Sequence, residues 1–197
     1  EIVIAAFFGA TYLVDAYLAA LVIPMMLFSI VNQALTTTVV PLIIDYGNRE
    51  GTSSVLKMLN SVTTFFSIIL AIFILFGEFF AELLVQLVAP GFSATALNLT
   101  KDLTRILLPI MLFLGLAGIG SGILQSKKRF IFPAFIGIPY NVLIIIAVLL
   151  FGKQFGINAL AIGTLIGVIG QWLFQIPDLR RTGFRFRWGI DSSHPGF

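Results

Sequence analysis

The sequence has 197 residues, of which 58% are hydrophobic and only 11% are charged, with a formal net charge of +3. A soluble domain usually carries about 25% charged residues, and one core of this length could not hide so much apolar surface, so a soluble globular protein is excluded. Cysteine is absent, which excludes disulfides and thiolate chemistry. We therefore expect an all-α integral membrane protein whose apolar side chains face lipid.

The chain begins with an apolar segment, residues 1–8, that is far shorter than the roughly 20 residues needed to cross a bilayer. It has no basic start and no cleavage site, so it is not a signal peptide and is expected to be the end of a truncated helix. A turn at residues 9–11 follows. Five apolar stretches, separated by Gly, Pro and polar residues, then predict five full membrane spans. These spans cover about residues 12–44, 57–76, 99–125, 130–151 and 156–176.

The segment at residues 78–89, between the second and third spans, has a different pattern. Glu78, Glu82 and Gln86 recur every four residues, and apolar residues fill the positions between them. This spacing places the polar groups on one helix face, which is typical of a short helix lying at the membrane interface. A simple extension of the preceding span is the alternative. Pro90 and Gly91 end the segment in either case.

Two pairs of glycines lie one helical turn apart within the later spans, Gly118 with Gly122 and Gly163 with Gly167. Small residues at this spacing let two helix backbones approach closely in lipid. We expect them to mark helix contacts within the chain.

The basic residues are distributed unevenly between the two sides of the membrane that these spans define. One side holds Arg49, Lys57, Lys127, Lys128, Arg129, Arg180, Arg181, Arg185 and Arg187. The other side holds Lys101, Arg105 and Lys153. Cytoplasmic loops carry the excess of Lys and Arg, so the first side is predicted to face the cytoplasm. The two large basic clusters are also expected to touch anionic membrane lipids, whereas nucleic acid is not an expected partner.

Catalytic chemistry finds little support in the sequence. The single histidine, His194, lies in the polar end segment 191–197, which is interpreted as a truncated cytoplasmic loop. The spans contain no close pair of carboxylates, no Cys/His cluster and no glycine-rich phosphate loop, so we expect neither an enzyme nor a bound metal or cofactor.

The candidate functional residues are therefore the few polar groups inside spans. They are Asp15, Asn32, Gln33, Asn141, Gln171 and Gln175. Asp15 is the most informative of them, because a carboxylate in apolar surroundings usually faces a cavity or a partner, although an acid at a helix N-terminus is the alternative. The amides could line a hydrated cavity or hydrogen-bond a neighbouring helix. Arg105, at the start of the third span, is a candidate for contact with an anionic headgroup, or it extends to the interface.

Several strings, in order and spacing, resemble the MurJ (MviN) family of lipid II flippases along nearly the whole chain. The first is Phe8-Gly-Ala-Thr-Tyr-Leu-Val-Asp15-Ala-Tyr17, followed by Ile23-Pro24. Further matches are Leu87-Val-Ala-Pro-Gly-Phe92, Leu103-Thr-Arg-Ile-Leu-Leu-Pro109, Gly122-Ile-Leu-Gln125, Arg129-Phe130, Pro133-Ala134, Pro177-Asp-Leu-Arg-Arg181 and Phe184-Arg-Phe-Arg187.

The resemblance implies a two-lobe exporter fold that works by alternating access, of which this chain would be most of the N-terminal lobe. It implies transport of an undecaprenyl-linked cell-wall or polysaccharide precursor across the bacterial cytoplasmic membrane, with the C-terminal lobe as a partner. Asp15 matches a functional position of the family. Val22, Phe28 and Ser29 stand where typical members carry arginine. A multidrug exporter of the same superfamily, or a scaffold without transport in envelope synthesis, are the alternatives.

Overall fold

In a computed structural model of the protein, residues 6–9, 11–34, 52–184 and 186 are described. Within these ranges the secondary structure is helical, without any strand. Five segments of the described chain are long and apolar enough to cross a membrane: Tyr12–Ile30, Met58–Phe79, Ala94–Ser126, Gly137–Phe155 and Ile157–Arg181. The predicted all-α membrane fold with five full spans is confirmed.

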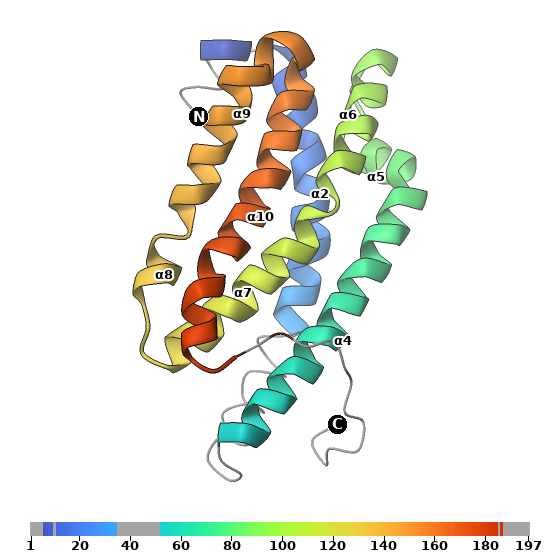
Figure 1. The fold of residues 1–197 in the computed structure, drawn as a ribbon. Coiled ribbons are helices and arrows are strands. Elements are labelled where there is room, and N and C mark those ends of the chain that lie inside the picture. The colour runs from blue at the N-terminus through green and yellow to red at the C-terminus, as the bar shows by residue number, and fades with distance from the viewer. Residues whose placement is uncertain (1–5, 10, 35–51, 185, 187–197) are drawn as a thin grey trace.

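Eight helices are described, in chain order. They are α2 (Tyr12–Ala34), α4 (Thr52–Phe79), α5 (Ala81–Val88), α6 (Ala94–Leu107), α7 (Ile110–Ser126), α8 (Ile131–Ala134), α9 (Gly137–Phe155) and α10 (Ile157–Arg181). Successive spans run in opposite directions, with α2, α6–α7 and α10 descending in the view of Figure 1 while α4 and α9 ascend. This alternation is what a chain crossing a membrane repeatedly requires.

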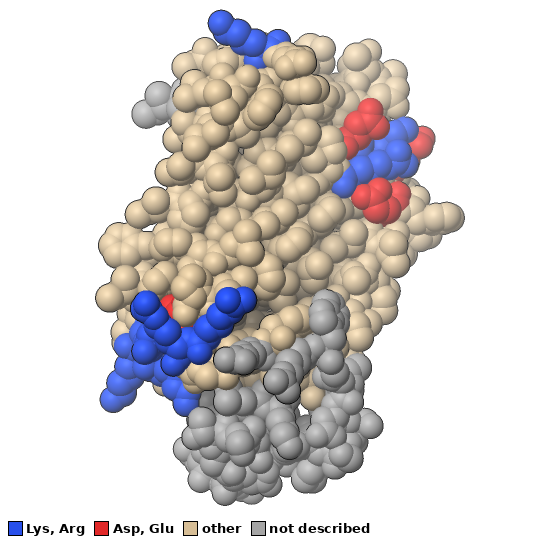
Figure 2. Space-filling view, viewed as in Figure 1, with Lys and Arg blue, Asp and Glu red and all other residues tan. Residues whose placement is uncertain are grey.

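The alternation gathers basic side chains at one end of the helix bundle. The C-terminal ends of α7 and α10 meet at the lower left of Figure 1, and Figure 2 shows a group of Lys and Arg side chains there. We call this the basic end, defined by Lys127, Lys128, Arg129, Arg180 and Arg181. The far end is the opposite one, where α2 begins and where the turn from α9 to α10 lies beside Lys153. The positions Arg49, Arg185 and Arg187 lie outside the described residues.

The third span, expected as one helix over residues 99–125, is two helices that start earlier. α6 begins at Ala94 because Ser93 caps it, its Oγ accepting a hydrogen bond from the Ala96 N–H at 3.3 Å. The break between α6 and α7 falls at Pro109, whose ring nitrogen has no hydrogen to donate to the preceding turn. Backbone hydrogen bonds of the 3₁₀ type, between residues three apart, bridge the break. One of them runs from the Leu112 N–H to the Pro109 carbonyl at 3.2 Å.

The bounds of the other elements also differ from the expected ones. The segment 130–151 is a short α8 followed by α9, which continues to Phe155. α10 continues five residues past 176, because a helix C-terminus favours the cations Arg180 and Arg181. The amphipathic segment 78–89 contributes α5 over Ala81–Val88, while Glu78 belongs to the end of α4.

Two expected segments extend beyond what the structure describes. α2 is described to Ala34, so the rest of the expected span 12–44 lies outside the described residues, as does the end segment 191–197. Of the initial segment, residues 6–8 are helical.

Glycine lets α9 and α10 pack closely, as expected for one of the two glycine pairs. A Cβ atom added at Gly163 would lie 2.7 Å from the Cβ of Ala147, and one at Gly167 would lie 3.0 Å from the backbone oxygen of Tyr140. The expectation for Gly118 and Gly122 is wrong, because an added Cβ there would meet nothing within 4 Å. Those two positions face away from the neighbouring helices.

Candidate functional site

Asp15 lies in the first turn of α2 at the far end of the bundle, with an exposed side chain. Among the described residues its carboxylate has no hydrogen bond and no ion pair. Its backbone N–H donates to the Thr11 carbonyl at 3.3 Å, and its side chain accepts no hydrogen bond from a described backbone N–H at this helix end. The partial positive charge of a helix N-terminus favours an acid at this position.

The rotation of α2 about its axis determines where Asp15 points. Ala16, Tyr17, Ala20 and Ile23 are buried against the neighbouring helices. The Tyr17 hydroxyl lies 2.8 Å from the Thr164 hydroxyl of α10, and the pair is buried. Thr164 in turn donates to the Leu160 carbonyl, so Tyr17 is the donor if Thr164 keeps that bond. With this face fixed inside, Asp15 is turned to the uncovered side.

The uncovered side of α2 forms a continuous stripe of exposed residues. Spacings of three and four residues separate Asp15, Leu18, Val22, Met25 and Ser29, which places them on one face of the helix. Apart from its ends the stripe is apolar. A long apolar face with a carboxylate at one end is a surface that another part of a membrane protein, or lipid, would cover.

Asn32 and Gln33 are exposed near the end of α2 that lies toward the basic end. Each takes part in an interaction in the structure, so neither amide is without a partner. They are 17 and 18 residues from Asp15, which corresponds to about 26 Å along a helix. Asp15 and these amides therefore lie on one helix but at two separate places.

Gln175 is fully buried and holds α10 to α7. Its Oε1 accepts a hydrogen bond from the Ser121 hydroxyl at 3.0 Å, and its Nε2 donates to the Ala117 carbonyl at 3.1 Å. Nε2 also reaches the backbone oxygen of Gln171, one turn earlier, at 3.4 Å. Of the two open interpretations of this amide, the bond to a neighbouring helix is therefore the one that the geometry shows.

Asn141 is exposed on α9, and its Nδ2 donates to the Gly137 carbonyl of its own helix at 2.8 Å. This bond back to the preceding turn uses one donor and leaves the side chain facing outward. In the described part of the chain no hydrogen bond joins Asn141 to Asp15 or Gln175, so the structure does not bring the sequence candidates together at one point.

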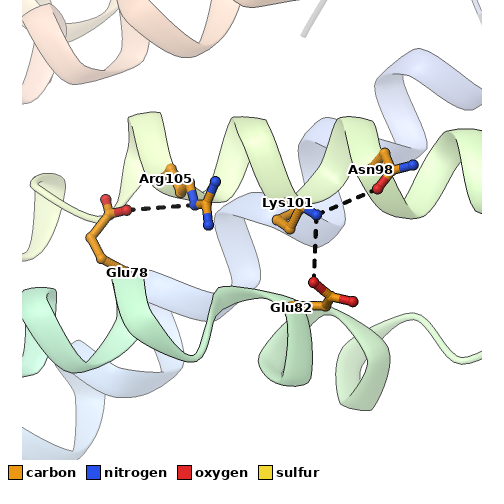
Figure 3. A network of polar contacts seen from close by, with 5 residues as sticks. All are labelled: Glu78, Glu82, Asn98, Lys101 and Arg105. Carbon is orange, nitrogen blue, oxygen red and sulfur yellow. Dashed lines mark hydrogen bonds and ion pairs between the residues drawn. The ribbon is translucent and has the colours of Figure 1, made fainter.

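Arg105 belongs to a network of charges between α6 and the α4–α5 region, drawn in Figure 3. Its Nε lies 3.7 Å from Glu78 Oε2, and Lys101 Nζ lies 3.5 Å from both Glu82 Oε2 and Asn98 Oδ1. The pairs are partly exposed, so they contribute little to stability. They do explain why Glu78 and Glu82 recur at helical spacing: both face the cations of α6.

Asp178 was not among the candidates from sequence. Its carboxylate is nevertheless the only buried carboxylate among the described residues. It is 4% exposed on α10 and pairs with the Arg129 guanidinium, which comes from the turn after α7. The expected end of the last span at 176 placed Asp178 in a loop. An acid two residues past an apolar span, in a chain with a Lys-Lys-Arg cluster, is the signal that could have identified this pair.

Within the described residues no three His, Cys, Asp or Glu side chains gather in a way that could hold a metal ion. The polar groups instead form bonds between pairs of helices and at the ends of the bundle. Such an arrangement fixes the positions of the helices and charges relative to one another.

Comparison with known families and proteins gives consistent results over nearly the whole chain. The sequence model of the family described as Lipid II flippase MurJ matches residues 4–197. The chain is 34% identical over 187 residues to the Lipid II flippase MurJ of Thermosipho africanus, covering 94% of this chain and 38% of that protein. It is 30% identical over 205 residues to the Lipid II flippase MurJ of Burkholderia cenocepacia, covering 100% of this chain and 40% of that protein.

A solved structure titled Lipid II flippase MurJ, inward closed conformation, has a similar fold. The TM-score is 0.78 at 29% identity, and the match covers 95% of this chain and 40% of that one. The chain therefore spans well under half the length of the proteins it resembles.

Proposed function

The chain belongs to the MurJ family of lipid II flippases, and we propose that it forms the N-terminal lobe of a transporter for a lipid-linked cell-wall precursor. The relatives are named for lipid II, so lipid II or a related undecaprenyl-linked saccharide is the proposed substrate. Transport, not catalysis, is the proposed activity. The two lobes of the full-length protein would expose one cavity alternately to the two sides of the membrane.

One observation supports this proposal most directly, the exposed stripe along α2. Its five residues from Asp15 to Ser29 lie on one face that no described helix covers. A carboxylate is costly next to lipid, whereas a hydrated groove between two lobes solvates it. We propose that the stripe faces the second lobe and that Asp15 lies on the ion or substrate path. Asn32 and Gln33 are proposed to line the same path nearer the basic end.

The remaining candidates have more limited proposed roles. Gln175 would keep α7 and α10 together while the lobe moves as one body, since it bonds across that contact. Gln171, whose backbone oxygen accepts from Gln175 Nε2 within α10, would help to orient that amide. The exposed side-chain amide of Asn141 would be available to hydrogen-bond a partner that lies against α9. Arg105, which Glu78 pairs at 3.7 Å, would meet anionic headgroups on the outer side of the membrane.

The chain is a multi-pass membrane protein, and we propose that it resides in the bacterial cytoplasmic membrane with its basic end in the cytoplasm. The described cations support this orientation: five define the basic end, whereas Lys101, Arg105 and Lys153 lie elsewhere. An excess of Lys and Arg marks cytoplasmic loops.

Complementation tests the proposed function. The full-length protein would be expressed in a strain whose own lipid II flippase can be switched off, with the Burkholderia cenocepacia relative as the positive control. Rescue of growth, together with precursor reaching the outer leaflet, is expected. Failure to rescue at a membrane level equal to that of the control would contradict the proposal. Resistance to cationic drugs without rescue would point to a multidrug exporter.

A further inference from the structure

A cleft of about 610 Å³ lies between α4 and α10, and residues of α7 form its floor. Its lining includes Thr63 of α4, Ile119 of α7, Trp172, Ile176 and Arg180 of α10, and Phe184 of the segment that follows. Volumes of about 300–1,000 Å³ are typical of sites that take a small molecule. None of the lining residues belongs to α2, so the cleft is separate from the stripe proposed for transport.

The walls of the cleft belong to membrane-crossing helices and are mostly apolar. Ile119, Trp172 and Ile176 contribute hydrocarbon and aromatic surface, and Leu116 and Leu179 extend it. Trp172 and Arg180 are eight residues apart on α10, which corresponds to about 12 Å along the helix. One leaflet of a hydrocarbon core about 30 Å thick has a depth of about 15 Å, so the cleft runs through most of a leaflet.

The basic end of the cleft carries an uncompensated positive charge. The nearby acid on α10, Asp178, is already paired with Arg129. Arg180 is exposed, and among the described residues its guanidinium has no ion pair and no hydrogen bond. Arg181 and the Lys127–Arg129 turn add positive charge at the same end of the bundle. Figure 2 shows a group of Lys and Arg side chains at the lower left.

An apolar slot one leaflet deep with a guanidinium at its polar mouth complements an anion attached to a hydrocarbon chain. A guanidinium binds phosphate oxygens with two parallel hydrogen bonds, and it sits at the depth of the headgroups when its helix ends there. We propose that this cleft binds a phospholipid with an anionic headgroup, the phosphate on Arg180 and one acyl chain against Trp172 and Ile176. The site is built on α4, α7 and α10, and its occupancy would fasten α4 to α10 across α7.

Lipid binding to the full-length protein tests this proposal without requiring transport. Purified protein would be exposed to phosphatidylglycerol or phosphatidylcholine, and the bound lipids counted by native mass spectrometry. The parent protein is expected to retain phosphatidylglycerol preferentially. Arg180→Gln should reduce that retention about fivefold, the effect of one basic residue at an anionic surface. Arg181→Gln is the matched control, because it removes the same charge from the next residue, which does not line the cleft.

A second variant tests the apolar part of the site. Ile176→Trp places bulk in the slot and should reduce retention of both lipids, while glycerol phosphate, which lacks an acyl chain, should not displace phosphatidylglycerol from the parent. Equal losses in Arg180→Gln and Arg181→Gln would overturn the proposal, since binding would then reflect total charge. Retention unaffected by Ile176→Trp in a folded variant, judged by its elution and melting temperature, would overturn it as well.

Discussion

The hydroxyls of Tyr17 and Thr164 lie 2.8 Å apart in the buried core, although 147 residues separate them in the chain. This hydrogen bond joins α2 to α10 and lies two residues from Asp15. It therefore fixes the face of α2 that is buried and, with it, the direction of the candidate carboxylate.

Removing this bond should weaken the contact between α2 and α10. Hydrogen bonds between membrane helices contribute on average about 0.6 kcal/mol and at most about 1.7 kcal/mol, so Tyr17→Phe should lower the melting temperature measurably but modestly. Thr164→Val should have a similar effect, and the double variant should be no worse than either alone. Tyr12→Phe is the control, since Tyr12 is an exposed tyrosine on the same helix. A double variant whose losses simply add would contradict a direct bond.

The close approach of α9 and α10 at Gly163 makes a second stability prediction. In Gly163→Ala the new Cβ would lie 2.7 Å from Ala147 Cβ, an atom that cannot rotate away, so the two helices must separate. Overpacking of this kind costs about 1–3 kcal/mol. Gly118→Ala is the matched control, because its Cβ would meet nothing within 4 Å and alanine favours a helix by up to about 1 kcal/mol. Thermal unfolding in detergent measures the stability of the two variants. Equal melting temperatures for Gly163→Ala and Gly118→Ala would contradict the close contact of α9 with α10 at Gly163.

The Arg129–Asp178 pair predicts an asymmetric response to loss of either charge. Arg129→Gln leaves a buried carboxylate without its cation and should cost about 1–3 kcal/mol. Asp178→Asn leaves a cation that is partly exposed and can be solvated, so its cost should be smaller. The double variant Arg129→Gln with Asp178→Asn should recover much of the loss of the first. The melting temperatures of the variants measure these losses of stability. A larger loss for Asp178→Asn than for Arg129→Gln would refute the inference that the carboxylate is the buried partner of the pair.

The orientation of the bundle predicts which positions water-soluble reagents reach. The 197 residues include no cysteine, so a cysteine introduced at position 127 or 153 provides one labelled site in this part of the protein. In intact cells an impermeant thiol reagent should label Lys153→Cys, and Lys127→Cys should be labelled only after the membrane is opened. Labelling of both positions from outside would contradict the proposed cytoplasmic basic end.

The spans could be predicted from sequence because hydropathy is a sum over many residues. Apolar stretches and the basic clusters between them gave five spans and their directions without any knowledge of contacts. Bounds were less accurate where a local effect decided them. The Ser93 cap moved the start of the third span, and the missing N–H of Pro109 divided it.

Contacts between distant parts of the chain could not be predicted from periodicity. The Tyr17–Thr164 bond and the Arg129–Asp178 pair depend on how helices pack, and their spacing in the chain carries no regular pattern. For the glycines, the i, i+4 spacing identified two pairs, but only packing decides which faces a neighbour. Gln175 was recognised as a candidate, whereas its role in joining α7 to α10 required the positions of Ser121 and Ala117.

The last prediction concerns Asp15 in the full-length protein. If its carboxylate lies on the transport path, Asp15→Asn should fail to rescue growth of a strain depleted of its own flippase, or should rescue it poorly, at a normal membrane level. The fold should survive, because the carboxylate is exposed and its loss breaks no bond to the described residues. Asp102→Asn is the matched control, an exposed acid on α6 outside the stripe of α2. Asp15→Glu, which keeps the charge, should retain part of the activity.

Full rescue by Asp15→Asn would show that Asp15 does not lie on the transport path. Equal loss in Asp15→Asn and Asp102→Asn would show that acidic charge in this part of the protein matters, and not the position on α2.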